Sequence, residues 1–228
     1  MSRGIFITAT GTDVGKTYIT ALIVKLLRHH NINAGYYKAA LSGAELINSK
    51  LTAGDAKHVC DISGIEGEPN SLVSYIYKTA VSPHLASRIE GNPVEMDVII
   101  SDFNLMKDKF DFITVEGSGG IVCPLRMDEK NVMLTDIIKE LNLDLIIVAP
   151  ASLGSINSTV LTASYAESMN IAVKGIILNQ YDKNNFMHTD NKKMIEELTG
   201  VPVVACVPEN SKDLDIDINA LTSLYKEL

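Results

Sequence analysis

The sequence has no long apolar run and few cysteines. No stretch approaches the roughly 18 apolar residues of a membrane-spanning helix, and the apolar run at residues 5–7 is too short for a signal peptide. The three cysteines, Cys60, Cys123 and Cys206, are far apart and form no Cys-x-x-Cys pair. These absences argue against a membrane protein and a secreted disulfide scaffold. We expect a cytoplasmic protein whose thiols are reduced and packed as small apolar groups.

Basic residues are too few to give the chain a positive surface. It carries 20 lysines and arginines against 28 aspartates and glutamates, a formal net charge of −8. This balance does not suit nucleic acid or an anionic membrane as a partner, although it leaves room for one basic pocket. The composition, 46% apolar and 21% charged, is that of a globular protein. No linker, repeat or low-complexity run divides the chain, so we expect one domain over residues 1–228.

Short apolar runs alternate with longer segments of helical periodicity. Most of the runs are continuously apolar, which is typical of strands covered on both faces. The predicted strands are residues 5–8, 34–38, 112–116, 145–149, 175–178 and 203–207. The predicted helices are residues 16–30, 132–141, 157–169 and 192–198. This order predicts an α/β fold, a mostly parallel sheet with helices on both faces. In such sheets, ligands bind beyond the carboxyl ends of the strands.

A phosphate-binding loop is predicted at residues 8–17, Thr-Ala-Thr-Gly-Thr-Asp-Val-Gly-Lys-Thr. It follows the first predicted strand and opens the first predicted helix, whose free N–H groups and positive dipole end favour a phosphate. Lys16 is placed to reach the β- and γ-phosphates, and the Thr17 hydroxyl to ligate Mg²⁺. Thr10 replaces the first glycine of the usual G-x-x-x-x-G-K-[ST] pattern. The alternative is a plain strand-to-helix turn, but the motif in this position favours nucleotide binding.

Three charged residues elsewhere have two interpretations each. Glu116 closes a predicted strand before the glycine-rich residues 117–120 and is either a Mg²⁺ ligand or a solvated carboxylate. Asp55 alone is typical of a helix N-cap, the role that its local sequence favours. Lys38 ends another predicted strand. It either neutralises charge on a transferring phosphoryl group or is an ordinary solubilising lysine.

In combination, these motifs resemble dethiobiotin synthase, the ATP-dependent synthetase of biotin biosynthesis. The matching segments cover nearly the whole chain: residues 11–17, 35–38 (Gly-Tyr-Tyr-Lys), 42–43, 55, 82–84 (Ser-Pro-His), 115–120, 153–157 and 179. This set is far more specific than a phosphate loop alone. The resemblance implies a P-loop NTP-hydrolase-like fold and a cyclo-ligase. Such an enzyme uses CO₂ and MgATP to close a cyclic urea on 7,8-diaminononanoate (7,8-diaminopelargonate), through a carbamate and a carbamic–phosphoric anhydride, and releases ADP and phosphate.

The resemblance also implies roles for individual residues, position by position. The implied catalytic residues are Thr12, Lys16 and Lys38, and the implied Mg²⁺ ligands are Thr17, Asp55 and Glu116. Besides Lys16 and these ligands, the implied ATP contacts are Asp13, Val14, Gly15, Tyr18, Gly117, Ser118, Gly119, Asn179, Gln180, Val207, Pro208 and Glu209. The implied contacts of the diamine or its carbamate are Thr12, Lys38, Ser42, Ser82, Pro83, Gly117 and Ser118.

A further implied site belongs to a second subunit. In the family, the substrate carboxylate rests on a helix N-terminus of the other protomer, which corresponds here to Leu153, Gly154, Ser155, Ile156 and Asn157. The resemblance therefore implies a homodimer that shares its substrate sites across subunits.

Two features of the sequence bear on nucleotide binding: the start of the phosphate loop, and a motif at the position where GTPases recognise guanine. The family usually begins its loop with Gly-Thr-Asp, where this chain has Ala9, Thr10 and Gly11; we expect the loop to form nonetheless. Residues 179–182, Asn-Gln-Tyr-Asp, stand where many GTPases have Asn-Lys-x-Asp, so Asp182 is a candidate acceptor for guanine. The missing lysine and the family resemblance favour ATP.

Two other functions compete with this prediction. A switch ATPase of the related dimeric P-loop group typically carries an extra lysine at the start of the loop, where this chain has Gly11. Such proteins often end in a membrane-binding helix, whereas residues 218–228 contain only Lys226 as a basic residue and are expected to form a docked terminal helix. A simple nucleotide-dependent kinase needs a general base near Lys38, and the sequence offers none.

Overall fold

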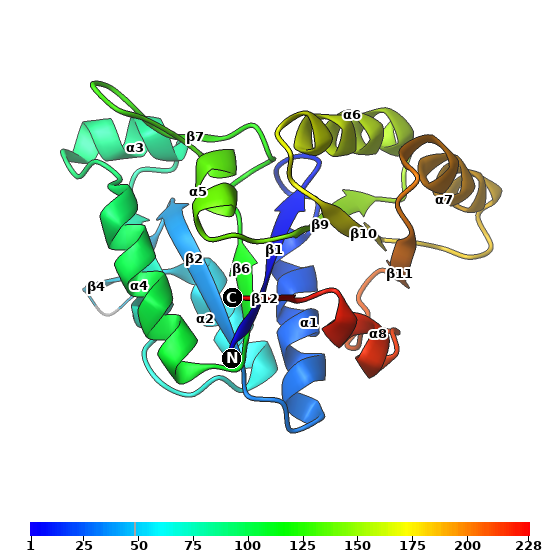
Figure 1. The fold of residues 1–228 in the computed structure, drawn as a ribbon, viewed down its shortest axis with the longest axis horizontal. Coiled ribbons are helices and arrows are strands. Elements are labelled where there is room, and N and C mark those ends of the chain that lie inside the picture. Colours follow the sequence, from blue (N-terminus) through cyan, green and yellow to red (C-terminus); the bar gives the residue numbers. More distant parts are fainter. Residues whose placement is uncertain (48) are drawn as a thin grey trace.

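The computed structural model describes residues 1–47 and 49–228. Its centre is a parallel sheet with the strand order β11-β10-β9-β1-β6-β2-β5 (Figure 1). These strands are β1 (Arg3–Ala9), β2 (Ala34–Ser42), β5 (Val73–Tyr77), β6 (Phe112–Glu116), β9 (Leu145–Pro150), β10 (Val173–Asn179) and β11 (Val203–Val207). A short strand, β12 (Lys226–Glu227), pairs antiparallel with β1. The mostly parallel sheet predicted from the sequence is confirmed.

The middle strands form the core because they are apolar along both faces. Every residue of β1 after Arg3 is buried, and so is every residue of β9 before Pro150. Isoleucine, valine and phenylalanine dominate these runs, and such side chains pack well on a pleated sheet that is covered on both sides. The predicted strands 112–116 and 203–207 have the bounds of β6 and β11.

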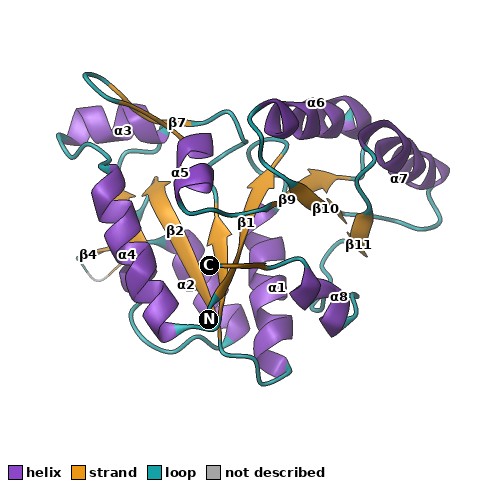
Figure 2. Cartoon of the chain, in the orientation of Figure 1, coloured by secondary structure: helices purple, strands orange, loops and turns teal. Residues whose placement is uncertain are grey.

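Helices cover both faces of the sheet, as predicted (Figure 2). On one face, α1 (Lys16–His29) packs against α2 (Gly54–Ser63); on the other, α4 (Met96–Lys109) contacts α5 (Leu134–Glu140). In Figure 1, α4 and α5 lie in front of the sheet and α2 behind it. The remaining helices are α3 (Pro83–Glu90), α6 (Ser155–Ser168), α7 (Phe186–Thr199), α8 (Ile218–Ser223) and the 3₁₀ helix η1 (Pro69–Leu72).

Two hairpins lie outside the main sheet. One consists of β3 (Glu45–Ile47) and β4 (Lys50–Thr52), and the other of β7 (Pro124–Met127) and β8 (Asn131–Met133). The first hairpin stands between β2 and α2, and the second follows β6 after a loop. Both belong to connections at the carboxyl ends of strands, the edge at which a ligand site was predicted.

Most predicted boundaries lie within two residues of those observed, and three differ by more. The strand predicted to end at residue 38 continues to Ser42, because the apolar residues that follow Lys38 are buried as well. The helix predicted at 192–198 starts at Phe186, where Asn185 caps it. The terminal helix predicted at 218–228 is wrong in its second half: α8 ends at Ser223. The buried Tyr225 hydroxyl bonds Thr114 Oγ1 at 2.6 Å, and the following residues pair with β1.

The cysteines are free, with Cys60 and Cys123 buried and Cys206 half-buried. Among residues 1–47 and 49–228, no helix has both the length and the apolar character to cross a membrane.

Candidate functional site

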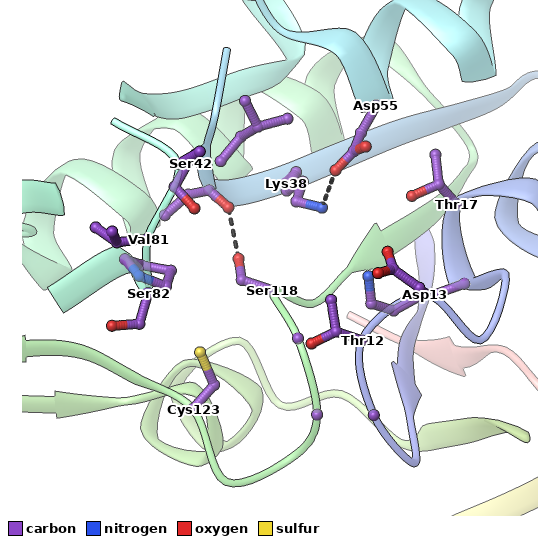
Figure 3. A pocket seen from close by; sticks show the side chains of 18 of the residues that line it. Thr12, Asp13, Thr17, Lys38, Ser42, Asp55, Val81, Ser82, Ser118 and Cys123 are labelled. Carbon is purple, nitrogen blue, oxygen red and sulfur yellow. Dashed lines mark hydrogen bonds and ion pairs between the residues drawn. The ribbon is translucent and has the colours of Figure 1, made fainter. Parts of the chain in front are cut away.

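A cleft of about 1040 Å³ opens where β1, β2 and β6 end (Figure 3). Its walls come from residues that are far apart in sequence. They are the loop after β1 and the start of α1, the carboxyl end of β2, one side of α2, the loop before α3 and the loop after β6. Of the residues predicted for the site, those that line this cleft are Thr12, Asp13, Gly15, Lys16, Thr17, Tyr18, Lys38, Ser42, Asp55, Ser82, Pro83, Ser118 and Gly119.

The predicted phosphate loop joins the end of β1 to the N-terminus of α1. Thr10 N–H still bonds the Val148 carbonyl of β9 at 3.0 Å, so the loop starts from a fixed strand. Gly15 precedes the helix with φ +88°, a conformation that disfavours a side chain. The helix N-terminus therefore opens into the cleft with its first N–H groups and its positive dipole end, which suits an anionic ligand.

Glu116 lies under the cleft and gathers donors from two other elements. Its Oε1 accepts hydrogen bonds from Lys16 Nζ at 3.1 Å, Thr17 Oγ1 at 2.8 Å and Lys38 Nζ at 2.8 Å. The Glu116 side chain is completely buried, so the solvated carboxylate considered from the sequence is excluded. Three predicted residues of the phosphate site thus meet at a single carboxylate oxygen.

Lys38 is a buried residue in the middle of β2 and not a solubilising lysine at a strand end. It stands in register with Glu116 on the neighbouring β6, and it is 3% exposed. Its ammonium group bridges two carboxylates, Glu116 at 2.8 Å and Asp55 Oδ2 at 2.5 Å (Figure 3). A charged lysine is tolerated in this apolar strand because the carboxylates of Glu116 and Asp55 compensate for the hydration that it loses on burial.

Asp55 does not cap α2, in contrast to the role that its local sequence favours. The N-cap position is Ala53, without a side-chain hydrogen bond, and Asp55 follows in the first helical turn. Its carboxylate instead pairs with the ammonium group of Lys38 on β2. The helix dipole favours a negative charge in the first turn, so the Asp55 carboxylate is stabilised there without capping the helix.

Lys38 and Glu116 hold each other in their charged forms. Burial raises the pKa of Glu116, but Lys38 and Lys16 outweigh it and bring that pKa down to about 2. Burial lowers the pKa of Lys38, and Glu116 and Asp55 more than restore it, so the net shift is upward. For Lys16, burial prevails and lowers the pKa, because it has one close carboxylate partner. The formal charges of these four side chains sum to zero.

The residues predicted around the nucleotide base lie beside the phosphate loop rather than in the cleft. Asn179, the last residue of β10, donates its side-chain amide to the Val14 carbonyl at 3.0 Å. Its neighbour in register on β11 is Val207, and Pro208 and Glu209 follow that strand. Gln180 begins the loop after β10 with φ 55°. Tyr18 of α1 donates its hydroxyl to the Ser211 carbonyl, which fixes the segment after β11 against the same helix.

The segment predicted to serve a second subunit stands apart from this chain's cleft. Leu153 and Gly154 lie in the turn between β9 and α6, and α6 begins at Ser155. Leu153 is 86% exposed, whereas Ser155 is buried and its hydroxyl has no hydrogen-bond partner. Ile156 and Asn157 continue the first turn of α6.

Several wall residues were not predicted from the sequence. They are His58 on α2, Leu41 on β2, Ala80 before α3, and Val122, Cys123 and Pro124 after β6. Leu41 was detectable in principle, because the apolar run of β2 continues past Lys38. Burial raises the pKa of the Cys123 thiol to about 11, so this side chain contributes a neutral surface. Ser118 Oγ donates to the Ala40 carbonyl at 2.5 Å and ties the glycine-rich loop to β2.

The oxygen donors suit a metal that takes few protein ligands. Across the described parts of the chain, no three His, Cys, Asp or Glu side chains gather into a metal-binding group. Thr17, Glu116 and Asp55 nonetheless surround the two lysines with one hydroxyl and two carboxylates. Mg²⁺ commonly uses one or two carboxylates and completes its shell with water and phosphate oxygens. The donor set therefore fits Mg²⁺ and does not fit a fully protein-caged ion.

Comparison with known proteins decides the family. A family model described as an AAA domain matches residues 3–214. The protein named ATP-dependent dethiobiotin synthetase BioD from Clostridium botulinum strain Eklund 17B is 56% identical over 225 residues, covering 99% of both chains. Its namesake from strain Loch Maree is 52% identical over 228 residues, covering 100% of both chains. The chain belongs to the dethiobiotin synthetase family. The prediction of an ATP-dependent ligase of this family is thereby confirmed.

Solved structures confirm the P-loop fold predicted for this dethiobiotin synthetase family member. A MinC:MinD cell division protein complex from Aquifex aeolicus superposes with a TM-score of 0.57 at 18% identity, covering 92% of this chain and 83% of that chain. A ParA family ATPase from Chlorobium tepidum gives a TM-score of 0.58 at 16% identity, covering 92% and 84%. At these identities the likeness concerns the fold alone.

Proposed function

We propose that this protein carboxylates 7,8-diaminononanoate and closes it to dethiobiotin, with consumption of MgATP and release of ADP and phosphate. The observation that carries the proposal is the meeting of Lys16, Lys38 and Glu116 where the phosphate loop enters a cleft large enough for a second substrate. A nucleotide-binding domain without a second reactant needs no such space beside its phosphates. The relatives at 52–56% identity carry the name of the same reaction.

The cleft offers the diamine a polar floor and an apolar wall. Lys38 and Thr12 present polar groups near the phosphate loop, and Ser42 adds a hydroxyl farther along the cleft, on the side of Val81 and Ser82 (Figure 3). Val81 and the neutral Cys123 lie on the side away from this loop, and Leu41 also lines the cleft (Figure 3). The substrate joins two amines to a carboxylate through an aliphatic chain, so it matches a surface whose polarity changes in this way.

The chemistry needs positioning and positive charge more than a nucleophile. One substrate amine adds to CO₂ and loses a proton, giving a carbamate. A carbamate oxygen attacks the γ-phosphorus of ATP, ADP departs, and the second amine closes the ring and expels phosphate. Lys16 and Lys38 neutralise the charge of the transferring phosphoryl group. The Thr12 hydroxyl lines the same part of the cleft. Bound substrates that fill the cleft would keep water from the carbamic–phosphoric anhydride.

Mg²⁺ would be held by Thr17, Asp55 and Glu116, the donors that surround the two lysines. When bound, the ion adds positive charge to the β- and γ-phosphates. The role of the chain itself is to keep the Glu116 carboxylate charged before the ligand enters. The low pKa of Glu116 achieves this at neutral pH.

The base of ATP is proposed to bind between the end of β10 and the segment after β11. The backbone from Asp13 to Gly15 and the glycine-rich residues 117–119 would approach the phosphates closely. Asn179, Gln180, Val207, Pro208 and Glu209 would surround adenine, with Tyr18 packed beneath that segment. The position that many GTPases fill with lysine holds Gln180, which is why adenine is preferred to guanine.

We further propose that the chain works as a single cytoplasmic domain that forms a homodimer. The turn with Leu153 and Gly154 and the N-terminus of α6 would receive the substrate carboxylate bound in the partner's cleft. Leu153 is 86% exposed, so this turn is accessible to a second subunit.

The deciding experiment measures phosphate release and acid-stable label from isotopic bicarbonate, in the presence of MgATP, with and without 7,8-diaminononanoate. We expect phosphate release that depends on the diamine and is matched one for one by label in the product. Nucleotide hydrolysis that is indifferent to the diamine would refute the proposal and leave a switch ATPase as the better function. The fold likeness to MinD and ParA proteins does not favour that function, because Gly11 stands where such proteins typically carry their extra lysine.

A further inference from the structure

The second oxygen of the Glu116 carboxylate has a partner of its own. The Tyr36 hydroxyl donates to Glu116 Oε2 at 3.1 Å, and both side chains are buried. The other oxygen, Oε1, accepts from Lys16, Thr17 and Lys38. The two oxygens of the carboxylate therefore have different partners. Oε2 accepts from a tyrosine inside the sheet, and Oε1 accepts from the donors that line the cleft.

The strand geometry of β2 gives Tyr36 this position. Side chains two residues apart on a strand share a face, so Tyr36 and Lys38 both reach Glu116 of β6. Tyr37 points to the opposite face, where its hydroxyl contacts Ser74 Oγ at 2.7 Å and the Ile99 carbonyl of α4 at 3.2 Å. Two adjacent buried tyrosines thus use their hydroxyls for different purposes.

We infer that Tyr36 is a positioning residue that fixes the rotation of the Glu116 carboxylate, so that Oε1 stays directed at the cleft as a ligand for a divalent cation. This inference rests on the proposed role of Glu116 in holding Mg²⁺. Because the terminal torsion of a glutamate has a broad minimum, a carboxylate with donors on one oxygen alone is free to rotate. When phosphates draw Lys16 and Lys38 away from Oε1, the bonds from Thr17 and Tyr36 remain, and the bond from Tyr36 holds the group through Oε2 without occupying Oε1.

The difference between Tyr36 and its neighbour provides a matched test. Tyr36→Phe removes the donor to Glu116, and Tyr37→Phe removes an equally buried hydroxyl on the other face. The probe is Mn²⁺, whose binding to each folded protein in the presence of a non-hydrolysable ATP analogue is measured by electron paramagnetic resonance. Binding of the analogue without metal is measured alongside.

For Tyr36→Phe we expect Mn²⁺ to bind about fivefold to tenfold more weakly, since a hydrogen bond to a charged group contributes roughly that much or more. Metal-free binding of the analogue should stay within about twofold of wild type. In turnover, the KM for Mg²⁺ should rise while kcat at saturating Mg²⁺ changes little. Tyr37→Phe should lower stability to a similar extent and leave the Mn²⁺ affinity unchanged, because its hydroxyl does not touch the site.

Unchanged or tighter Mn²⁺ binding by Tyr36→Phe would overturn the inference, and so would an equal loss in Tyr37→Phe. If Tyr36→Phe does not fold, Tyr36→Met removes the same donor with an adaptable apolar side chain and carries the same expectation. Failure of the proposed function is detected separately, because wild-type protein would then show no diamine-dependent phosphate release, whereas the Mn²⁺ measurement needs no turnover.

Discussion

Asn179 lies so close to Gly15 that a methyl group on the glycine would come within 2.1 Å of the asparagine amide nitrogen. The same amide donates to the Val14 carbonyl at 3.0 Å. The end of β10 thus contacts the last residues of the phosphate loop, so the shape of the loop depends partly on a strand that lies two places from β1 in the sheet. A glycine at position 15 is required twice, for its φ of +88° and for this contact.

Gly15→Ala is therefore expected to weaken nucleotide binding by about fivefold to a hundredfold, since strain of this kind costs on the order of 1–3 kcal/mol. The measurement is the dissociation constant of a labelled ATP analogue by equilibrium dialysis. Gly11→Ala is the matched control, because the nearest atom to its added methyl group lies 3.9 Å away. Equal affinities of Gly15→Ala and wild type would contradict the account of the loop.

Lys38→Leu should reduce turnover by about a thousandfold, because a buried cation beside the transferring phosphoryl group is lost. Binding of the nucleotide analogue should persist, since Lys16 and the loop backbone remain. Lys57→Leu, which removes a surface lysine that pairs with Asp61, is the control and should keep wild-type turnover. Initial rates of phosphate release at saturating diamine report both variants. Turnover of Lys38→Leu near that of wild type would make Lys38 a structural residue only.

Leu153→Asp tests the proposed second subunit. We expect the wild type to sediment as a dimer and the variant to show at least a tenfold higher KM for the diamine, through repulsion of the substrate carboxylate and a weakened dimer. Leu198→Asp, at an exposed position late in α7, is the control. Position 155 is less suitable, because Ser155 is buried and a charge there would disturb the fold. A diamine KM that stays at the wild-type value in Leu153→Asp argues against the shared site.

The depressed pKa of Glu116 makes a prediction for acid stability. A carboxyl group that moves from an ordinary pKa of 4.5 to about 2 on folding stabilises the protein fully above the higher value, and the contribution disappears as the pH falls through the lower one. Over this window the shift corresponds to about 3 kcal/mol of unfolding free energy. The raised pKa of Lys38 acts at the other limit, so its contribution is lost only in strongly alkaline solution.

Urea unfolding of wild type and Glu116→Gln at several pH values between 2 and 6 measures this contribution. The variant should be less stable at pH 6, because two buried lysines lose a partner, and its free energy of unfolding should fall less steeply toward pH 2. Glu66→Gln, at an exposed position, should keep the wild-type slope. Identical slopes in wild type and Glu116→Gln would contradict the pKa assignment.

The sequence was sufficient for the sheet and for the phosphate loop, because continuous apolar strands and a strand–loop–helix motif are local patterns. It was not sufficient for Lys38 and Asp55. A lysine after an apolar run and an aspartate at the start of a helix each have a commonplace explanation. Their pairing depends on β2 continuing past Lys38 and on α2 packing behind it. The family resemblance indicated both residues, whereas the burial that makes them partners is a property of the folded chain.

Tyr36 and the cleft wall were missed for a related reason. Tyr36 in an apolar strand is typical of core packing, and nothing in the sequence distinguishes its hydroxyl from that of Tyr37. Which of the two faces Glu116 is decided by the register between β2 and β6. The same applies to the terminal strand β12, since two residues give no periodicity from which to predict pairing.

The neutral sum of charges around Lys38 has a consequence for ligand choice. In the free protein, each lysine already has a carboxylate as its counterion, so an incoming phosphate must compete with an anion that cannot diffuse away. A bare anion that wins this competition leaves the buried carboxylate of Glu116 without its lysine partners in a low-dielectric environment. When an anion arrives together with a divalent cation, the lysines pair with the anion and the carboxylates pair with the cation. No charged side chain is then left without a partner. The cleft thereby discriminates against free phosphate and metal-free nucleotide, because the binding of either one leaves a carboxylate unpaired, which costs free energy.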